Sequence, residues 1–306
     1  MFDNLYRKGS SENLAFLKSK GDFEFCYGDI RNKNDIENII LTHKPDIIYH
    51  LSGQVAMTTS LLNPQLDFEV NALGTFNLLD SVRKHKSDAI VVYSSTNKVY
   101  GDLEQYSYKE NATRYICDDF IDGFDENVPL DFHSPYGCSK GCGDTYMLDF
   151  YRIFGVRSVV FRHSSMYGGR QFATSEQGWI GYFINEVLNK RKINISGNGK
   201  QVRDILYSSD MARLYLQVPK YIDKMQGNAY NIGGGVENSL SIIELFEILE
   251  ELTGIEILYS TNPSRISDQK VFIANLTKLK KHMPFSIKIN KIDGIKKMIE
   301  WVREIR

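Results

Sequence analysis

The chain has 306 residues, of which 42% are hydrophobic, so it is long enough to bury a sizeable core, and we expect two lobes. Its formal net charge of −1 gives no electrostatic basis for binding nucleic acid or an anionic membrane. Because no apolar run approaches roughly 18 residues and the first residues are polar, we expect a cytoplasmic protein without a membrane span or secretory signal.

Residues 2–4 have the pattern of a strand that ends at an acidic residue, Asp3. In a dinucleotide-binding unit, such a residue holds a ribose hydroxyl about 20 residues after a glycine-rich phosphate loop. No glycine loop precedes Asp3, and the glycines at 233–235 do not open a helix in an N-terminal unit. We therefore expect a chain that is N-terminally incomplete by roughly 30 residues.

Short apolar runs then alternate with helical patterns. The runs with strand character are residues 23–26, 47–51, 89–94 and 158–163, and the helical stretches are residues 35–42, 66–86 and 136–154. Continuous apolar strands separated by helices favour a parallel sheet that is buried on both faces. The sequence therefore predicts an α/β fold with a doubly wound, Rossmann-like parallel sheet.

Polar clusters follow the predicted strands, at residues 28–30, 52–54, 94–97 and 163–165. In open parallel sheets, ligands bind beyond the carboxyl ends of the strands. We therefore expect these clusters to meet at one binding site.

The pattern loosens after Tyr167. We expect helices at residues 179–190, 240–253 and 292–306, short strands at 202–207 and 229–232, and a Gly-Asn-Gly turn within 195–200. No linker or repeat separates these segments. We expect a cofactor-binding domain formed by residues 1–166 with 203–230 returning to it, and a smaller α/β substrate lobe formed by residues 167–202 and 231–306.

Tyr136 and Lys140 stand four residues apart on a predicted helix, so their side chains share one face. A phenol normally titrates near pH ~10, and an adjacent ammonium favours the phenolate. Such a phenol can accept the proton of a sugar hydroxyl. Thr96, which follows the strand at 89–94, is expected to share that proton. Chance alone produces about one Tyr–Lys pair at this spacing, so the neighbouring motifs must decide its meaning.

Cysteine usage does not indicate a disulfide framework. The four cysteines are Cys26, Cys117, Cys138 and Cys142. Cys138 and Cys142 lie one helical turn apart, but no second pair or adjacent histidine supports a metal or redox site. We expect a packing role for both, and no metal.

These motifs together resemble the extended short-chain dehydrogenase/reductase family, which comprises NAD-dependent sugar-nucleotide epimerases and dehydratases. The matching strings are His50-Leu51-Ser52-Gly53, Asn71-Ala72-Leu73-Gly74-Thr75, Ser94-Ser95-Thr96 with Val99-Tyr100-Gly101, Tyr136 with Lys140, Gly197-Asn198-Gly199 with Arg203-Asp204, and Asn231-Ile232-Gly233-Gly234. The resemblance implies catalytic roles for Thr96, Tyr136 and Lys140, and NAD as a tightly held cofactor. It also implies a homodimer that packs the predicted helices 66–86 and 136–154 into a four-helix interface.

The resemblance further implies where the cofactor binds. Its adenosine end would contact Asp3, Asn4, Arg7, Asp29 and Ile30, and its pyrophosphate and nicotinamide end would contact Leu51, Ser52, Gly53, Gln54, Ser94, Tyr136, Lys140 and His163. Substrate would contact Thr96, Ser165, Arg203 and Arg265, with the two arginines on the nucleotide diphosphate.

Two positions narrow the reaction. Family dehydratases place Asp-Glu directly after the catalytic threonine, whereas this chain has Asn97 and Lys98. Neither residue supplies a carboxyl acid, so elimination of water and decarboxylation are disfavoured. Epimerisation by oxidation and reduction is favoured.

Longer strings resemble the members of the family that epimerise CDP-linked 3,6-dideoxyhexoses at C2. These strings lie at residues 53–60, 93–102, 131–140 and 161–171. The resemblance implies C2 epimerisation through a transient 2-keto sugar, in the supply of sugars for surface polysaccharide such as O-antigen. Ser165 stands where 4-epimerases usually have an asparagine, which fits a different sugar orientation.

Two alternatives remain open. A UDP- or CDP-hexose 4-epimerase would use the same three catalytic residues. A catalytically impaired NAD-binding remnant would explain the absence of a phosphate loop, because pyrophosphate binding relies on backbone N–H groups at a helix N-terminus.

Overall fold

The computed structural model describes residues 1–85, 87–265 and 267–305. Its central sheet contains four parallel strands in the order β11-β7-β4-β3. The strands are β3 (Ile47–His50), β4 (Ile90–Thr96), β7 (Ser158–His163) and β11 (Asn228–Ile232). The predicted parallel α/β fold is confirmed.

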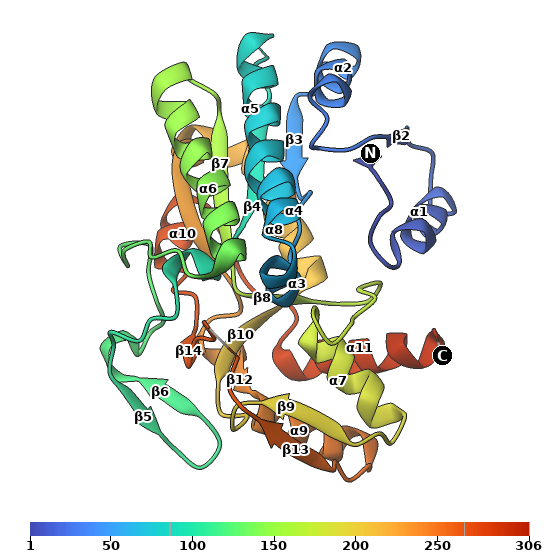
Figure 1. The fold of residues 1–306 in the computed structure, drawn as a ribbon, viewed down its shortest axis with the longest axis vertical. Helices are drawn as coiled ribbons and strands as arrows, with labels where there is room; N and C mark the ends of the chain where they lie inside the picture. Colours follow the sequence, from blue (N-terminus) through green and yellow to red (C-terminus); the bar gives the residue numbers. More distant parts are fainter. Residues whose placement is uncertain (86, 266, 306) are drawn as a thin grey trace.

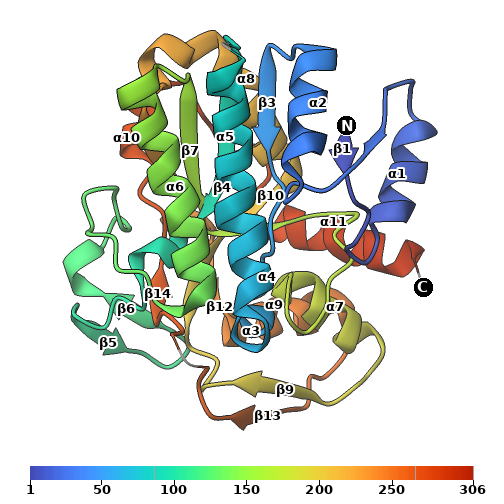
Figure 2. The same ribbon diagram turned by 45° about the horizontal axis from the view of Figure 1, so that its top comes forward.

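Helices cover both faces of this sheet, as Figures 1 and 2 show. On one face lie α5 (Gly74–Lys84) and α6 (Ser134–Phe154), and on the other lies α8 (Ser208–Met225). Alternate residues of β4 pack in opposite directions, because Val91 and Tyr93 join the core under α5 and α6, whereas Val92 joins the core that contains Leu214 of α8. Burial on both faces explains why the strands are continuously apolar.

The first residues form a separate two-stranded parallel sheet. It contains β1 (Phe2–Asp3) and β2 (Cys26–Tyr27), which are connected by α1 (Ser10–Lys18) and followed by α2 (Lys33–His43). Figures 1 and 2 show this pair beside β3, but it belongs to a different hydrogen-bonded sheet. The strand expected at residues 23–26 is therefore two residues long and begins at Cys26.

The expectation of one regular helix over residues 66–86 is wrong. The chain forms α3 (Met57–Leu62), α4 (Pro64–Asp67), a π-helical turn η1 (Phe68–Leu73) and then α5. The side chain of Asn71 bonds to the loop at Gln54 instead of lying on a regular helical surface. Such π turns frequently occur at functional sites. Lys86, the last residue of the expected helix, lies outside the described residues.

A second lobe surrounds another sheet and core. In this sheet β10 (Val202–Tyr207) pairs with β8 (Ser165–Tyr167), β12 (Ser239–Ser241) and β14 (Val271–Phe272). Nearby, β9 (Ile193–Ser196) pairs with β13 (Tyr259–Asn262). The helices α7 (Trp179–Leu188), α9 (Ile242–Thr253) and α11 (Lys291–Glu304) contribute to one core. Arg306, the end of the last expected helix, lies outside the described residues.

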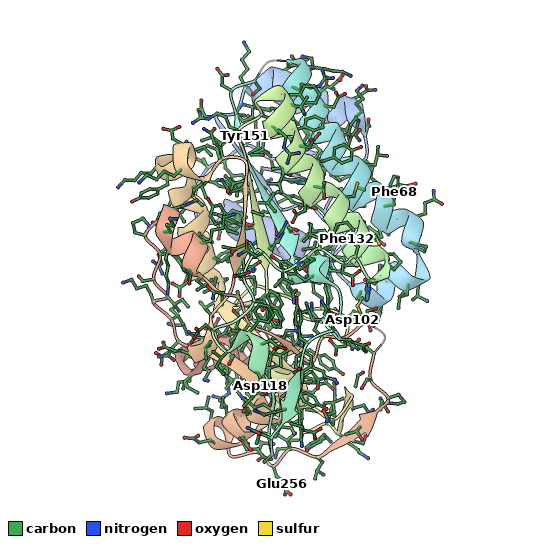
Figure 3. The ribbon with its side chains drawn as sticks, turned by 90° about the vertical axis from the view of Figure 1, so that its left-hand side faces the viewer. Phe68, Asp102, Asp118, Phe132, Tyr151 and Glu256 are labelled. Carbon is green, nitrogen blue, oxygen red and sulfur yellow. The ribbon has the colours of Figure 1, made fainter. Side chains whose placement is uncertain are left out.

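The remaining elements lie outside the two four-stranded sheets. They are η2 (Asn97–Tyr100), the hairpin β5 (Tyr108–Glu110) and β6 (Tyr115–Cys117), η3 (Asp118–Phe120), η4 (Val236–Asn238) and α10 (Thr277–His282). Figure 3 places Asp102 and Phe132 between the lobes and Asp118 beside the lower one. Among the described residues, no helix has the length and apolar character needed to cross a membrane.

Candidate active site

Two neighbouring strands of the central sheet end at the same edge. β4 and β7 pair in parallel so that Thr96 lies opposite His163. Both residues are buried, with relative exposures of 5% and 7%. Thr96 Oγ1 accepts a hydrogen bond of 3.2 Å from the backbone N–H of Lys98 and so caps η2. Ligands of open parallel sheets bind at this edge.

The N-terminus of α6 brings Tyr136 to the same edge. Pro135 lies in the first turn of the helix, where its missing N–H has no helical partner to lose. A Cβ at Gly137 would lie 3.0 Å from the carbonyl oxygen of Lys98, so glycine allows the helix to start close against η2. The phenol of Tyr136 is consequently within hydrogen-bonding reach of the Thr96 side chain.

The protonation of Tyr136 differs from the expectation. Burial raises the pKa of the phenol to about 12, and the hydrogen bond with Thr96 and the charge of Arg7 offset this only in part. The Lys140 ammonium instead donates to the carbonyl oxygen of Ser94 and lies 4.3 Å from the centre of the Tyr93 ring. The expectation that Lys140 lowers the pKa of Tyr136 is therefore wrong for this arrangement.

Lys140 itself is strongly perturbed. Its side chain is buried, and burial lowers its pKa to about 7, although the carboxylates of Asp144 and Asp67 act in the opposite direction. A lysine with such a pKa changes protonation state near neutral pH, which is the range in which general acids and bases work well.

A buried polar network connects α6 to the loop before α3. Asp67 accepts a 2.7 Å hydrogen bond from Gln54 Nε2 and another from the Ser139 hydroxyl. Asn71 accepts from the Gln54 backbone N–H and donates to its carbonyl oxygen, both at 2.9 Å. The side chain of Gln54 therefore points into the protein. Sequence reasoning did not assign roles to Asp67 and Ser139; the motif at Asn71 was the available signal.

The first two strands bring together residues expected near the adenosine end of the cofactor. Asn4 Nδ2 donates to Asp29 Oδ2 at 2.9 Å, and Asp3 accepts from the N–H of Leu5 at 2.6 Å. Hydrogen bonds from Arg31 hold the pKa of Asp29 well below its usual range. Asp3, Asn4 and Asp29 thus lie close together, as the sequence predicts.

The other expected cofactor contacts have varied surroundings. Ile30 is buried and approaches Gly74, because a Cβ there would lie 2.8 Å from its side chain. Leu51 is exposed and Ser52 is partly buried. Arg7 donates a hydrogen bond to Gln177 in the loop after β8. Their roles toward a cofactor remain predictions.

The three residues expected to contact only substrate have separate partners. Ser165 accepts a 3.2 Å hydrogen bond from Trp179 Nε1. Arg203 donates to Asp268 Oδ1 and to the carbonyl oxygen of Gln269, both at 2.8 Å. Arg265 is exposed and donates to the carbonyl oxygen of Ser175 at 3.4 Å.

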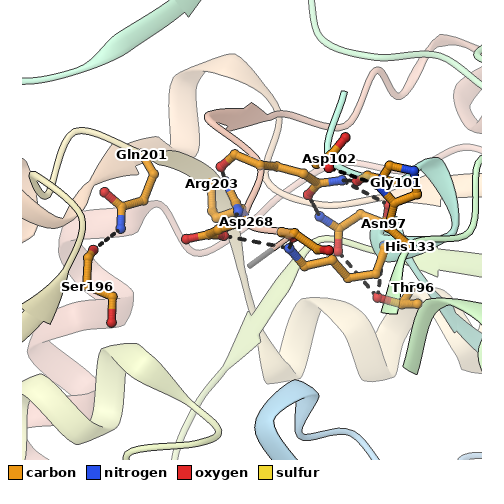
Figure 4. A network of polar contacts seen from close by, with 12 residues as sticks. Thr96, Asn97, Gly101, Asp102, His133, Ser196, Gln201, Arg203 and Asp268 are labelled. Carbon is orange, nitrogen blue, oxygen red and sulfur yellow. Dashed lines mark hydrogen bonds and ion pairs between the residues drawn. The ribbon is translucent and has the colours of Figure 1, made fainter. Parts of the chain in front are cut away.

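The positions directly after Thr96 connect the strand edge to the second lobe, as Figure 4 shows. Asn97 Nδ2 donates to Gln269 Oε1 at 2.7 Å, and Gln269 Nε2 donates to the carbonyl oxygen of Gly101 at 2.6 Å. Lys98 Nζ donates to the carbonyl oxygen of Ser267 at 3.1 Å. Neither Asn97 nor Lys98 provides a carboxyl group beside Thr96.

Outside this site, Glu24, Cys26 and His43 form a group that could hold a metal ion among the described residues. Cys26 Sγ lies 3.6 Å from His43 Nε2, whereas Glu24 approaches the other ring nitrogen, Nδ1, at 3.5 Å. One imidazole nitrogen cannot serve both contacts, so the three side chains are arranged as a thiol–imidazole–carboxylate chain.

The chain matches the model of the NAD dependent epimerase/dehydratase family over residues 2–233. The chain belongs to this family. Its relatives include sugar-nucleotide epimerases and dehydratases. The sequence similarity extends well beyond the catalytic motifs.

Three relatives show how far the similarity extends. The chain is 54% identical to CDP-paratose 2-epimerase of Salmonella typhi over 310 residues, covering 100% of this chain and 92% of that protein. It is 31% identical to a putative UDP-glucose 4-epimerase of Methanocaldococcus jannaschii, covering 92% of this chain and 84% of that protein. The structure of a UDP-glucose 4-epimerase of Thermotoga maritima with UDP-glucose superimposes with a TM-score of 0.81 at 25% identity, covering 99% of this chain and 98% of that one.

The cofactor of the family is NAD, and two features of the strand edge fit it. Nδ1 of His163 is buried and has no hydrogen-bond partner within the described part of the chain, so a polar group of a ligand would satisfy it. A Cβ at Gly53 would lie 3.6 Å from Lys140 Nζ and 3.1 Å from Asn71 Oδ1, so glycine keeps the space beside the ammonium open.

Proposed function

We propose that the chain catalyses the NAD-dependent epimerisation of a CDP-linked 3,6-dideoxyhexose at C2, converting CDP-paratose to CDP-tyvelose. The observation that carries this proposal is the 54% identity, over the whole chain, to CDP-paratose 2-epimerase of Salmonella typhi. The intact set of Thr96, Tyr136 and Lys140 at the strand edge supports an active enzyme.

Thr96 and Tyr136, at this edge of the sheet, both take part in transferring the proton of the sugar hydroxyl. A sugar hydroxyl that binds between Thr96 and Tyr136 can pass its proton to the phenolic oxygen. When bound, NAD supplies the two-electron oxidation of the carbinol carbon and, once reduced, the matching reduction. The 2-keto sugar turns over in the site, so that its opposite face is reduced. Tyr136 then returns the proton to the carbonyl oxygen. Lys140 would hold the cofactor ribose, for which its buried ammonium beside Gly53 is suited.

The surroundings of Tyr136 act on its pKa in opposite directions. Burial and the carboxylate of Asp67 favour the neutral phenol, whereas Thr96 and Arg7 favour the phenolate. A phenol that holds its proton firmly is a good acceptor once deprotonated. Removal of its hydroxyl should therefore affect turnover far more than binding.

The surroundings of Thr96 support epimerisation over elimination. Elimination needs an acid and a base beside the reacting carbons. Asn97 has no proton to give as an acid, and its amide is held by Gln269. Lys98 is held by Ser267 and Asp268.

We further propose the two-domain division at residues 1–166 with 203–230, and 167–202 with 231–306. Pairing of β11 with β7 supports the return of the chain to the first domain. Because β10 (Val202–Tyr207) pairs within the second sheet, this return begins at α8 and extends through β11 to Ile232. We place the enzyme in the cytoplasm, where its four free cysteines would stay reduced. There its product would supply surface polysaccharide synthesis, such as that of O-antigen.

The second candidate is a UDP- or CDP-hexose 4-epimerase, favoured by the 31% identity to the putative UDP-glucose 4-epimerase. Incubation of the enzyme and NAD with CDP-paratose, CDP-glucose and UDP-glucose, followed by proton NMR, separates the candidates. We expect inversion at C2 of CDP-paratose and no inversion at C4 of the hexoses. Inversion at C4 alone would contradict the proposal, and the Tyr136→Phe variant serves as the inactive control.

A further inference from the structure

Two cations share one carboxylate close to Thr96. Arg203 Nη2 lies 2.8 Å from Asp268 Oδ1, and Lys98 Nζ lies 3.6 Å from the same oxygen. The three side chains are mostly buried, with relative exposures of 13% for Arg203, 16% for Lys98 and 25% for Asp268. Figure 4 shows Arg203 and Asp268 next to each other in the polar network that also contains Asn97 and Thr96.

This cluster has a surplus of positive charge. Burial and the neighbouring guanidinium of Arg203 lower the pKa of Lys98 to about 8, although Asp268 and Asp102 act in the opposite direction. Asp268 is the carboxylate that both cations contact, because among the described residues Asp102 forms its ion pair with His133. An anionic ligand would therefore be attracted to this position.

We propose that Lys98, together with Arg203, binds the phosphate group that is attached to the sugar at C1, and that this contact favours reaction at C2. The proposal rests on the proposed function and deepens it by assigning Lys98 a role in substrate recognition. The ligand chemistry is the terminal phosphate of a nucleoside diphosphate.

The covalent structure of the substrate explains why this position suits C2. C2 is bonded directly to C1, which carries the phosphate through one oxygen, so the phosphate must lie close to Thr96 when C2 reacts there. When C4 reacts, the sugar ring separates the two groups. Lys98 follows Thr96 by two residues, and its N–H donates to Thr96 Oγ1, so its side chain begins next to the reacting centre.

Asp268 forms ion pairs with Lys98 and Arg203 and would therefore compete with the phosphate for these two cations. Lysine binds phosphate as a mobile point charge and arginine through a planar fork. Asp268 is held in place because its neighbours Ser267 and Gln269 bond to Lys98 and Asn97. Removing the negative charge of Asp268 should therefore strengthen phosphate binding.

The test compares CDP and CMP, which differ by the terminal phosphate alone. Calorimetric titration of the NAD-loaded enzyme measures both dissociation constants in wild type and in Lys98→Met. We expect Lys98→Met to weaken CDP binding about tenfold or more, and to change CMP binding less than about twofold. Lys270→Met is the matched control, because Lys270 is an exposed lysine two residues after Asp268, and this variant should change neither dissociation constant.

The competing explanation is that Lys98 only fastens residues 267–269 to η2. In that case Lys98→Met would weaken CDP and CMP equally, or neither, and the proposal would be overturned. Asp268→Asn gives a second test of opposite sign: we expect tighter CDP binding, whereas a purely structural clamp predicts weaker binding of both nucleotides. These outcomes do not depend on which sugar carbon reacts, so a failure of C2 epimerisation would refute the proposed function separately.

Discussion

Tyr136 and Lys140 stand one helical turn apart, and their protonation depends partly on the same neighbour. The carboxylate of Asp67 raises the pKa of both groups, whereas Thr96 and Arg7 act on Tyr136 and Asp144 acts on Lys140. Burial acts in opposite directions, because it raises the pKa of the phenol and lowers that of the lysine, whose ammonium lies beside Ser94 and Gly53.

A third titratable residue, His133, sits at the start of the catalytic helix. Its Nδ1 lies 2.8 Å from Asp102 Oδ2 and its Nε2 lies 3.1 Å from Asp131 Oδ2. The hydrogen bond with Asp102 raises the pKa of His133 above its ordinary value. Because the folded-state pKa is raised, the pair stabilises the fold fully below pH ~6.5 and loses its effect as the pH rises through the folded-state value.

The Asp102→Asn variant tests this pH dependence. We expect the pKa of His133, followed by NMR of its ring protons, to fall toward the ordinary value. The loss of unfolding free energy in urea should be larger at pH 6 than at pH 9. An equal loss at both pH values would contradict the assigned pairing.

At this scale the sequence predicts which side chains meet but not how they are charged or occupied. The strand rule correctly brings Thr96 to the same edge as His163, and the helix start brings Tyr136 there. The spacing of Tyr136 and Lys140 predicts the wrong shift of the phenol pKa, because burial depends on the whole fold. Arg203 is also held by Asp268, a residue 65 positions away that no local pattern connects to it.

At the scale of elements, α6 is fixed to the central sheet by a buried ion pair. Asp144 is fully buried, accepts two hydrogen bonds of 2.9 and 2.8 Å from Arg162 and accepts a third of 2.7 Å from Ser95. Removing one partner leaves a buried charge without compensation. The position of Lys140, one turn before Asp144, depends on this anchor.

Truncation of this anchor should be costly. We expect Asp144→Ala to lower the free energy of unfolding by about 3–5 kcal/mol. Asp149→Ala, on the same helix, is the matched control because Asp149 forms an exposed pair with Arg152 at 3.8 Å; it should stay within about 0.5 kcal/mol of wild type. Similar losses in the two variants, measured by urea denaturation, would refute the anchoring role.

The type of an element was predictable where the hydrophobic periodicity was strong. The boundaries of an element were not predictable where tertiary contacts interrupt it. The strands at 89–94 and 158–163 and the helix at 136–154 appear close to their expected places. The π turn at Phe68–Leu73 interrupts the expected helix because Asn71 bonds to Gln54 across the site. That partner lies in a loop, so the hydrophobic pattern contains no signal of it.

At the scale of the whole molecule, α5 and α6 present an apolar face to solvent. Phe76, Tyr146 and Phe154 are 36%, 40% and 49% exposed. Phe76 contacts Tyr146 edge-on with ring centres 5.6 Å apart, and Phe150 bridges toward Phe154. Contiguous exposed aromatic groups are typical of protein interfaces. This face supports the homodimer that the family resemblance implies, formed by pairing of the α5 and α6 helices.

The Phe76→Glu variant tests that assembly. Because a symmetric interface repeats each substitution twice, we expect the variant to shift from dimer to monomer in light scattering coupled to size exclusion. Leu216→Glu is the matched control, since Leu216 is 70% exposed on α8, which covers the other face of the central sheet. A monomeric wild type, or a Phe76→Glu variant that remains dimeric, would count against this interface.

The most direct test of the central claim uses CDP-paratose that carries deuterium at C2, incubated with the enzyme and NAD in ordinary water. Oxidation and reduction of the same carbon within a closed site should retain the deuterium at C2 of the inverted product, and Tyr136→Phe should form at least about 100-fold less product. Mass spectrometry and NMR of the product measure both. Loss of deuterium to water during inversion at C2 would indicate that the C2 hydrogen leaves as a proton and not as a hydride, and would contradict the account.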